Sequence, residues 1–359
     1  MPNRKIKIAL VTSNPGYGGA EKSLIRLSSS FKKIGFDSTL IFFNKYGKNS
    51  LQVNDSKVFL SEKTTNRFGF FYRLIIFFRL NKFLIKNHFT HLISTLPISD
   101  LIVSKSAFSH PVYRVANEFE NYLASIQNSK KQLRKIKRYK KIYNTSFLVA
   151  LTDSIEDDLV NLLDCESTKI HKIHNYIDHK DISFKIQEIP ENSLNEDFCV
   201  HMGRYVPQKR HDLLLDTWKI YKNLPTLYLL CEENQELHNQ ISLRKLEARV
   251  KILGYKKNPY PWIAKSKALI LCSDYEGFPT SLIEAMYCST RILITDGAKS
   301  CKQIMEHYPS YIARHNDPVD LGLKIQNAIK TDVPSYENEL KRYSEENAME
   351  LWLKVLNIK

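Results

Sequence analysis

The chain has 359 residues, of which 43% are hydrophobic and 25% are charged, and its formal net charge is +15. This composition is normal for a globular protein, and the length allows two domains with a sizeable core each. Strand-like runs alternate with helix-like runs throughout, which predicts an α/β fold. Strands are expected at residues 6–12, 38–43, 91–95, 147–151, 198–202, 226–231, 250–253, 268–272 and 291–295.

The first expected strand, residues 6–12, runs into a glycine-rich loop at residues 14–21 and then a helix at residues 23–31. Glycines let a backbone approach a ligand closely. The loop lacks the G-x-G-x-x-G spacing of dinucleotide sites and the spacing of a Walker loop. It therefore predicts either a ligand-facing loop or a plain strand-to-helix turn.

Residues 66–89 are rich in Phe, Leu and Ile. The longest uncharged apolar run, Leu74 to Phe78, is far shorter than the ~20 residues that cross a bilayer. We therefore expect residues 72–87 to form a buried helix of the first domain.

A strongly basic helix is expected at residues 129–143, with a narrow apolar seam at Leu133, Ile136, Tyr139 and Tyr143. Its cations favour either a solvated face or attraction to an anionic membrane, worth ~1 kcal/mol for each cation. Nucleic acid is disfavoured, because no binding motif accompanies the charge. The cations are Lys130, Lys131, Arg134, Lys135, Lys137, Arg138, Lys140 and Lys141.

The polar stretch at residues 183–197 predicts a linker between a first domain, 1–182, and a second domain, 198–342. The second domain opens on the strand 198–202, followed by Gly203 and Arg204, with Lys209 five residues further on. Two cations at the carboxyl end of a strand suit a diphosphate, although a solvated basic loop has the same composition. Arg210 and His211 are expected at the surface or behind the site.

The segment from Tyr275 to Ala285 places a Gly-Phe-Pro turn between two glutamates, Glu276 and Glu284. A strand is expected before the turn and a helix after it, with Thr280 or Ser281 as the N-cap and Glu284 in the first turn. Helix N-termini bind anions. The segment therefore suits a molecule that carries phosphates, bound by N–H groups, and sugar hydroxyls, bound by carboxylates.

This segment resembles the E-x₇-E signature of GT-B-type retaining glycosyltransferases, family 4, the glycosyl transferases group 1. Gly-Arg at 203–204, Gln-Lys at 208–209 and Gly-Gly-Ala-Glu at 18–21 are also similar to segments of that family. The resemblance implies two Rossmann-like doubly wound domains that face each other across a cleft. It also implies a C-terminal helix, 343–359, that crosses back to the first domain.

In such a protein Glu276 would orient the donor sugar, Glu284 would bind the ribose, and Arg204 and Lys209 would hold the leaving diphosphate. Relatives carry a histidine where this chain has Ala116, so Asn117 and Glu118 are the candidates on the acceptor side. The resemblance thus implies catalytic roles for Glu276, Arg204 and Lys209. The donor-binding set would be Gly18, Gly19, Phe278, Pro279, Thr280, Ser281, Leu282 and Glu284.

The function implied is retaining transfer of a sugar from a nucleotide sugar, expected to be a UDP-sugar, to a saccharide or lipid-linked saccharide in surface polysaccharide synthesis. Two alternatives stay open. One is a GT-B-type nucleotide-sugar epimerase, and the other is a non-enzymatic basic protein that binds membranes or nucleic acid.

No cofactor and no metal are expected, because the family transfers sugars without metal and the histidines and cysteines lack metal-ligand spacing. The six cysteines include no C-x-x-C pair and predict reduced core residues of a cytosolic protein. The short basic start runs directly into a strand, so we expect no signal peptide. We expect a cytoplasmic protein, with peripheral association at the inner face of the cell membrane through residues 129–143.

Overall fold

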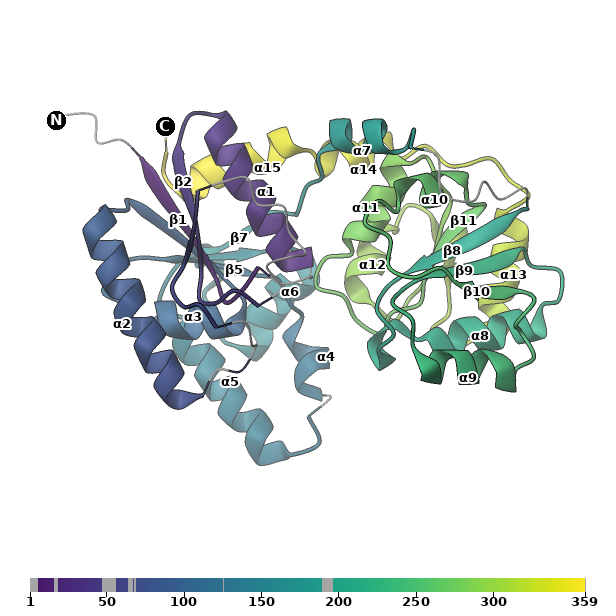
Figure 1. The fold of residues 1–359 in the computed structure, drawn as a ribbon, viewed down its shortest axis with the longest axis horizontal. Coiled ribbons are helices and arrows are strands. Elements are labelled where there is room, and N and C mark those ends of the chain that lie inside the picture. Colours follow the sequence, from purple (N-terminus) through teal and green to yellow (C-terminus); the bar gives the residue numbers. More distant parts are fainter. Residues whose placement is uncertain are drawn as a thin grey trace. The chain divides into compact units, whose positions relative to one another are not determined.

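The computed structural model describes residues 6–15, 19–46, 56–63, 67, 69–124, 126–188 and 196–358 (Figure 1). The chain divides into two compact units, Met1–Tyr176 with Glu345–Lys359, and Ile177–Ser344. The expected linker at residues 183–197 stays a prediction, because residues 189–195 lie outside the described part of the chain.

The first unit is built on a seven-stranded parallel sheet in the order β3-β2-β1-β4-β5-β6-β7. Its central strands are continuous apolar runs, such as Ile8–Val11 in β1, because helices cover both faces of a parallel sheet. Its strands are β1 (Lys7–Thr12), β2 (Asp37–Phe42), β3 (Lys57–Phe59), β4 (His91–Thr95), β5 (Val112–Val115), β6 (Leu148–Ala150) and β7 (Ile170–Lys172).

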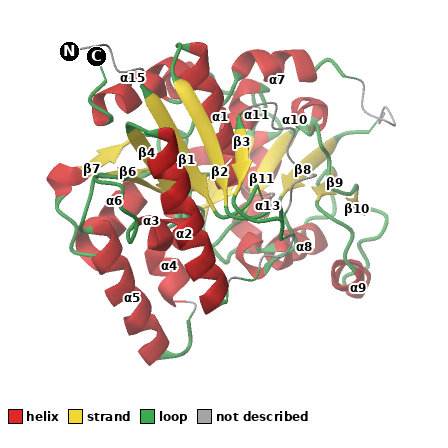
Figure 2. Cartoon of the chain, turned by 60° about the vertical axis from the view of Figure 1, so that its left-hand side comes forward, coloured by secondary structure: helices red, strands yellow, loops and turns green. Residues whose placement is uncertain are grey.

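Two groups of helices flank this sheet (Figures 1 and 2). Helices α1 and α15 pack together on one face, where the rings of Phe31 and Trp352 meet edge to face at 6.5 Å. Helices α2, α3 and α5 lie on the other face, because the strand order reverses at β1 and crossovers are right-handed. The helices are α1 (Gly19–Lys33), α2 (Phe70–Asn87), α3 (Pro97–Val103), α4 (Phe119–Ala124), α5 (Ser129–Tyr143), α6 (Asp153–Asp157) and α15 (Glu345–Val355).

The buried helix expected at residues 72–87 is buried on one side only. Helix α2 forms there, but it buries a single side, made of Tyr72, Ile76, Leu80 and Leu84. A single helix laid on a sheet can bury only the side that faces the sheet. The other side therefore leaves large apolar residues exposed: Phe70, Phe71, Leu74, Ile75, Phe78 and Ile85.

The second unit is built on a six-stranded parallel sheet in the order β10-β9-β8-β11-β12-β13. Among its helices, α8 contacts α9 and α13, whereas α11 contacts α7, α10 and α14. Its strands are β8 (Phe198–Met202), β9 (Thr226–Leu230), β10 (Val250–Ile252), β11 (Ala268–Leu271), β12 (Ile292–Thr295) and β13 (Ile312–Ala313). Its helices are α7 (His179–Lys185), α8 (His211–Ile220), α9 (Gln235–Leu243), α10 (Tyr260–Lys265), α11 (Thr280–Tyr287), α12 (Lys299–Ile304), α13 (Pro318–Ala328) and α14 (Glu337–Arg342).

Two doubly wound α/β units confirm the expected fold class, and each of the nine predicted strands forms within one residue of its expected ends. Strands β3, β5, β7 and β13 were not predicted. All six cysteines are buried and free, as expected for core residues. Among the described residues, no helix is long and apolar enough to cross a membrane.

Candidate active site

The second unit has a topological switch point between β8 and β11. These strands are neighbours, but the chain leaves β8 toward β9 on one side and leaves β11 toward β12 on the other. In open α/β sheets, ligands bind outside the carboxyl ends of the strands at such a point. The loops after the two strands meet there, since the Asp274 N–H donates to the Gln208 carbonyl at 2.9 Å and Gln208 Nε2 donates to the Tyr275 carbonyl at 2.6 Å.

Two of the predicted catalytic residues meet across these loops. The Lys209 ammonium, at the end of a 3₁₀ turn (Pro207–Lys209), donates to Glu276 Oε1, and the Ser273 hydroxyl donates to the same oxygen at 2.6 Å. The side chains of Lys209 and Glu276 are only 17% and 12% exposed. A charge-assisted hydrogen bond between side chains that are largely withdrawn from water is stronger than an ion pair at the surface. The Lys209–Glu276 pair therefore joins the two loops.

Arg204, the third predicted catalytic residue, follows β8 and is exposed. It makes no hydrogen bond or ion pair with any described residue. The Arg204 guanidinium therefore makes no bond to the described protein at this edge of the sheet, whereas the Lys209 ammonium is bonded to Glu276.

Arg210 was expected at the surface or behind the site, and its guanidinium links three elements there. It pairs with Asp212 at the start of α8 at 2.9 Å, pairs with Asp274 after β11 at 3.1 Å, and donates to Asn316. The hydrogen bonds to Asp212 and Asp274 raise the pKa of Arg210, so the guanidinium stays charged. The carboxylate two residues after Arg210 is the signal in the sequence that indicates this role.

His211 was expected at the surface or behind the site, and the structure buries it. Its ring is 2% exposed and packs edge to face on the fully buried ring of His201, with centroids 4.7 Å apart. His201 Nδ1 lies 2.8 Å from the Ile270 carbonyl on β11, to which it donates. Burial lowers the pKa of His211 to about 4 and holds that of His201 well below its usual range, so both rings are neutral.

Gly203 lies directly against the side chains of Lys209 and His201. A Cβ at residue 203 would stand 3.2 Å from Lys209 Cδ and 3.4 Å from His201 Nε2. The backbone after β8 therefore lies close to Lys209 and leaves little room for a side chain at residue 203.

Helix α11 begins at Thr280, with Pro279 at the N-cap position and no side-chain cap, so the expected cap by Thr280 or Ser281 was wrong. Pro279 has no N–H, and the N–H groups of Thr280 and Leu282 already donate at 2.9 Å to the carbonyls of Phe278 and Pro279. Only part of the expected row of N–H donors at 278–282 is therefore available to a ligand. Phe278, Pro279 and Leu282 are themselves buried.

Glu284 was expected in the first turn of this helix, but it is the fifth residue of α11, just beyond that turn. Its side chain is half-buried, and the Tyr260 hydroxyl donates a long hydrogen bond of 3.5 Å to Glu284 Oε1. The carboxylate thus faces α10, whose first residue is Tyr260.

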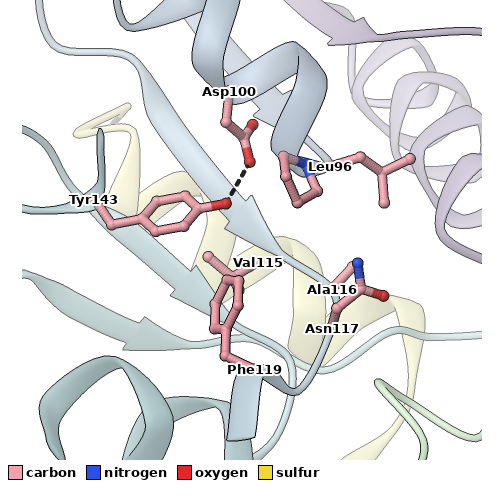
Figure 3. Close-up of a pocket in the computed structure, with 8 residues that line it drawn as sticks. Leu96, Asp100, Val115, Ala116, Asn117, Phe119 and Tyr143 are labelled. Atoms are coloured by element: carbon pink, nitrogen blue, oxygen red, sulfur yellow. Dashed lines mark hydrogen bonds between the residues drawn. The ribbon is translucent and has the colours of Figure 1, made fainter. Parts of the chain in front are cut away.

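In the first unit, a small pocket lies at the carboxyl ends of β4 and β5 (Figure 3). Asn117 and Ala116 line it, but Glu118 does not, because its buried carboxylate accepts from the Ser154 hydroxyl at 2.8 Å. Of the predicted loop glycines, Gly18 lies outside the described residues, and Gly19 opens α1.

Asp100 also lines this pocket, and sequence reasoning missed it. It is fully buried and accepts from the hydroxyls of Ser94 at 2.6 Å and Tyr143 at 2.8 Å. Burial raises the pKa of Asp100 to about 7. A single carboxylate in the apolar run Pro97–Val103 is the signal that points to it.

Within the described part of the chain, no group of three or more His, Cys, Asp or Glu side chains is arranged to hold a metal ion.

Residues 182–348, just under half of the chain, match the family model of the glycosyl transferases group 1. This segment is therefore similar to the glycosyl transferases group 1. It contains Arg204, Lys209, Glu276 and Glu284, so the switch-point site of the second unit lies entirely within the matched segment.

Two curated relatives are similar over part of this chain. The chain is 26% identical over 223 residues to the poly(ribitol-phosphate) alpha-N-acetylglucosaminyltransferase of Staphylococcus aureus, covering 58% of this chain and 43% of that protein. It is 31% identical over 150 residues to a Campylobacter jejuni 4-alpha-N-acetylgalactosaminyltransferase that acts on a diphospho-undecaprenol-linked saccharide, covering 41% of this chain and 40% of that protein. The chain therefore spans less than half of the length of these two relatives.

Among solved structures, the crystal structure of Anabaena Alr3699/HepE in complex with UDP is similar over nearly the whole chain. Its TM-score is 0.81 at 15% identity, with 98% of this chain and 100% of that chain covered. This similarity confirms the GT-B fold that the sequence resemblance implied.

Proposed function

We propose that the chain is a retaining glycosyltransferase of family 4 that transfers a sugar from a UDP-sugar to a saccharide or lipid-linked saccharide in surface polysaccharide synthesis. The observation that carries the proposal is the Lys209–Glu276 pair at the switch point between β8 and β11. In this proposal the Lys209 ammonium would bind a diphosphate, and the Glu276 carboxylate beside it would bind sugar hydroxyls. The group 1 domain match and the acceptors named for the two relatives support the same reading.

The diphosphate of the donor would take the exposed guanidinium of Arg204 and the ammonium of Lys209. Both cations would stabilise the negative charge that grows on the leaving nucleoside diphosphate. Lys209 and Glu276 are already bonded to each other, so both side chains are held in place before the donor binds. This preorganisation lowers the cost of orienting them during transfer.

Glu276 would accept hydrogen bonds from the donor sugar, and Glu284, eight residues later, would accept them from the ribose. This division of roles is that of the E-x₇-E signature. In retaining transfer the acceptor hydroxyl attacks from the face that the diphosphate leaves, and the departing phosphate takes the acceptor proton. No protein base and no metal are then required, and we propose that the transfer is metal-independent.

Thermal unfolding of the full chain with UDP, GDP, ADP and UDP-sugars, without metal, tests the donor site. A ligand that binds only the folded state raises the midpoint by mass action. We expect UDP and one UDP-sugar to raise it, and Glu284→Ala to remove the shift. Glu306→Ala, which changes an exposed carboxylate of the same unit, is the matched control and should keep the shift.

Product analysis then separates transfer from epimerisation. The proposal expects UDP release that depends on a saccharide or lipid-linked acceptor. An altered UDP-sugar formed without any acceptor would instead identify an epimerase.

We also propose that α5 draws the protein to an anionic membrane surface that carries lipid-linked acceptors. Lys135 and Lys140 bond to Tyr122 and Asp164, but the other cations of this helix are exposed, and α5 contains no Asp or Glu. Replacing Lys130, Lys131 and Arg134 by Ser should abolish salt-sensitive binding to anionic vesicles. Equal binding by wild type and variant would contradict the role of α5.

A further inference from the structure

Helix α2 carries a stripe of apolar side chains outside the core of the first unit. Phe71, Phe78 and Ile85 are 78%, 62% and 64% exposed, and Leu74 and Ile75 are exposed beside them. These positions are spaced by three, four or seven residues, so they lie along one side of the helix. The opposite side packs on the sheet, and so α2 is held with this stripe turned outward.

Cations run along one border of the stripe. Arg79, Lys82 and Lys86 are exposed and continue from Ile75 at steps of four, three and four residues. Arg79 is held by the Leu60 carbonyl at 2.6 Å, whereas no described residue is seen to pair with Lys82 or Lys86. From Phe70 to Asn87 the helix contains no Asp or Glu. The border of this apolar surface is therefore positive only.

The neighbouring helices extend this charge. Helix α3 contacts both α2 and α5, so the three helices form one layer on the same side of the sheet (Figures 1 and 2). The exposed cations of α5 thus belong to the layer that presents the stripe of α2, and neither α2 nor α5 contributes a carboxylate. A partner of this layer has to accept apolar side chains and positive charge together.

We propose that α2 lies in the surface of an anionic lipid bilayer, with its apolar stripe inserted among the lipid headgroups and acyl chains. A helix with one apolar side and a cationic border binds in this way, with its apolar face about 5–10 Å deep. A second copy of the chain fits poorly, because an isologous contact would bring two layers of cations together. The proposal rests on the proposed membrane association of α5, which sets the sign of the lipid charge. It adds insertion of the α2 side chains to the attraction between the α5 cations and the lipid.

Vesicle flotation of the full-length chain tests insertion. We expect the wild type to bind vesicles of phosphatidylcholine mixed with phosphatidylglycerol, and the double variant Phe71→Ser, Phe78→Ser to lose at least about tenfold in partitioning. The matched control is Phe184→Ser in α7, because Phe184 is also a helical phenylalanine, 73% exposed, in the other unit. This control should bind as the wild type does.

A second readout does not depend on removing side chains. In Phe71→Trp, the tryptophan emission should shift to shorter wavelength when anionic vesicles are added, whereas Phe184→Trp should show no shift. Unfolding midpoints and the UDP-induced thermal shift should match the wild type in every variant, since the exposed ring of Phe71 lies outside the core and the donor site.

The outcomes separate the two membrane proposals. If the Phe71, Phe78 double variant binds as tightly as the wild type while the α5 variant does not, insertion of α2 is overturned and attraction by α5 stands. If the wild type binds no vesicle, both proposals fail, and the UDP shift still decides the donor site. Dissociation of a dimer by the double variant, without vesicle binding, would identify a second copy as the partner and overturn the lipid proposal.

Discussion

The Lys209 ammonium bonds to the Glu276 carboxylate and thereby ties the loop after β8 to the loop after β11. These two strands border the switch point of the second sheet, where the chain turns in opposite directions. Both side chains are largely withdrawn from water. Removing either partner therefore leaves the other charge poorly solvated and unpaired.

Replacement of Lys209 by Ala should lower the turnover of sugar transfer by roughly 10²–10³-fold, because a preorganised cation at the leaving diphosphate is lost. Steady-state kinetics with a UDP-sugar measures this loss. Lys219→Ala, which removes an exposed lysine of α8, is the control and should retain full turnover. Wild-type turnover in Lys209→Ala would remove Lys209 from the donor site.

Substitution of Gly203 by Ala should weaken UDP binding several-fold with little loss of stability. The new methyl group would meet Lys209 Cδ at 3.2 Å, and the flexible lysine side chain would shift by a few tenths of an ångström. Calorimetric titration with UDP measures the change. Gly69→Ala, whose methyl group would meet no atom within 4 Å, should bind UDP as the wild type does.

The buried pair of His201 and His211 should make the protein sensitive to acid. The folded-state pKa of His211 is about 4, below its usual 6.5, because burial and then the Lys209 charge disfavour its protonated form; Asp212 opposes this effect. The unfolded chain therefore binds more protons below pH 6.5. The contribution of His211 to the free energy of unfolding is complete above pH 6.5. It falls by about 3 kcal/mol as the pH drops to about 4.

Denaturant unfolding at pH 7 and pH 4.5 tests this sign. The variant His211→Leu should lose less stability between these two pH values than the wild type does. An equal loss in both proteins would show that His211 carries none of the dependence. The pKa of His201 is lowered as well, so the variant should keep part of the pH dependence of stability.

Trp352 in α15 should be among the strongest single anchors of the first unit. It is 2% exposed and meets Phe31 of α1 edge to face, so Trp352→Ala should lower the free energy of unfolding by roughly 3–5 kcal/mol. Leu353, which only partly packs on this core, is the comparison, and Leu353→Ala should cost distinctly less. A small effect at Trp352 would mean that α15 docks weakly.

The sequence by itself determined the strands and the residue types of the site. Apolar runs of parallel strands are local signals, so β4 and β8 were predicted with the bounds that the structure shows. The motif spacings likewise singled out Lys209 and Glu276. Strand β7 has one apolar residue, Ile170, and so offers no apolar run as a local signal; it is held in the sheet because β6 pairs with it.

Only the tertiary structure decided which side chains meet and which are buried. Lys209 and Glu276 are 67 positions apart in the chain, and their contact exists because β8 and β11 are neighbours in the sheet. Burial of His211 and Asp100 depends on packing from several elements, which no local pattern encodes. The same holds for α2, whose apolar residues predicted a buried helix. A helix on a sheet buries one side only, and the other side remains as the surface that we propose meets the lipid.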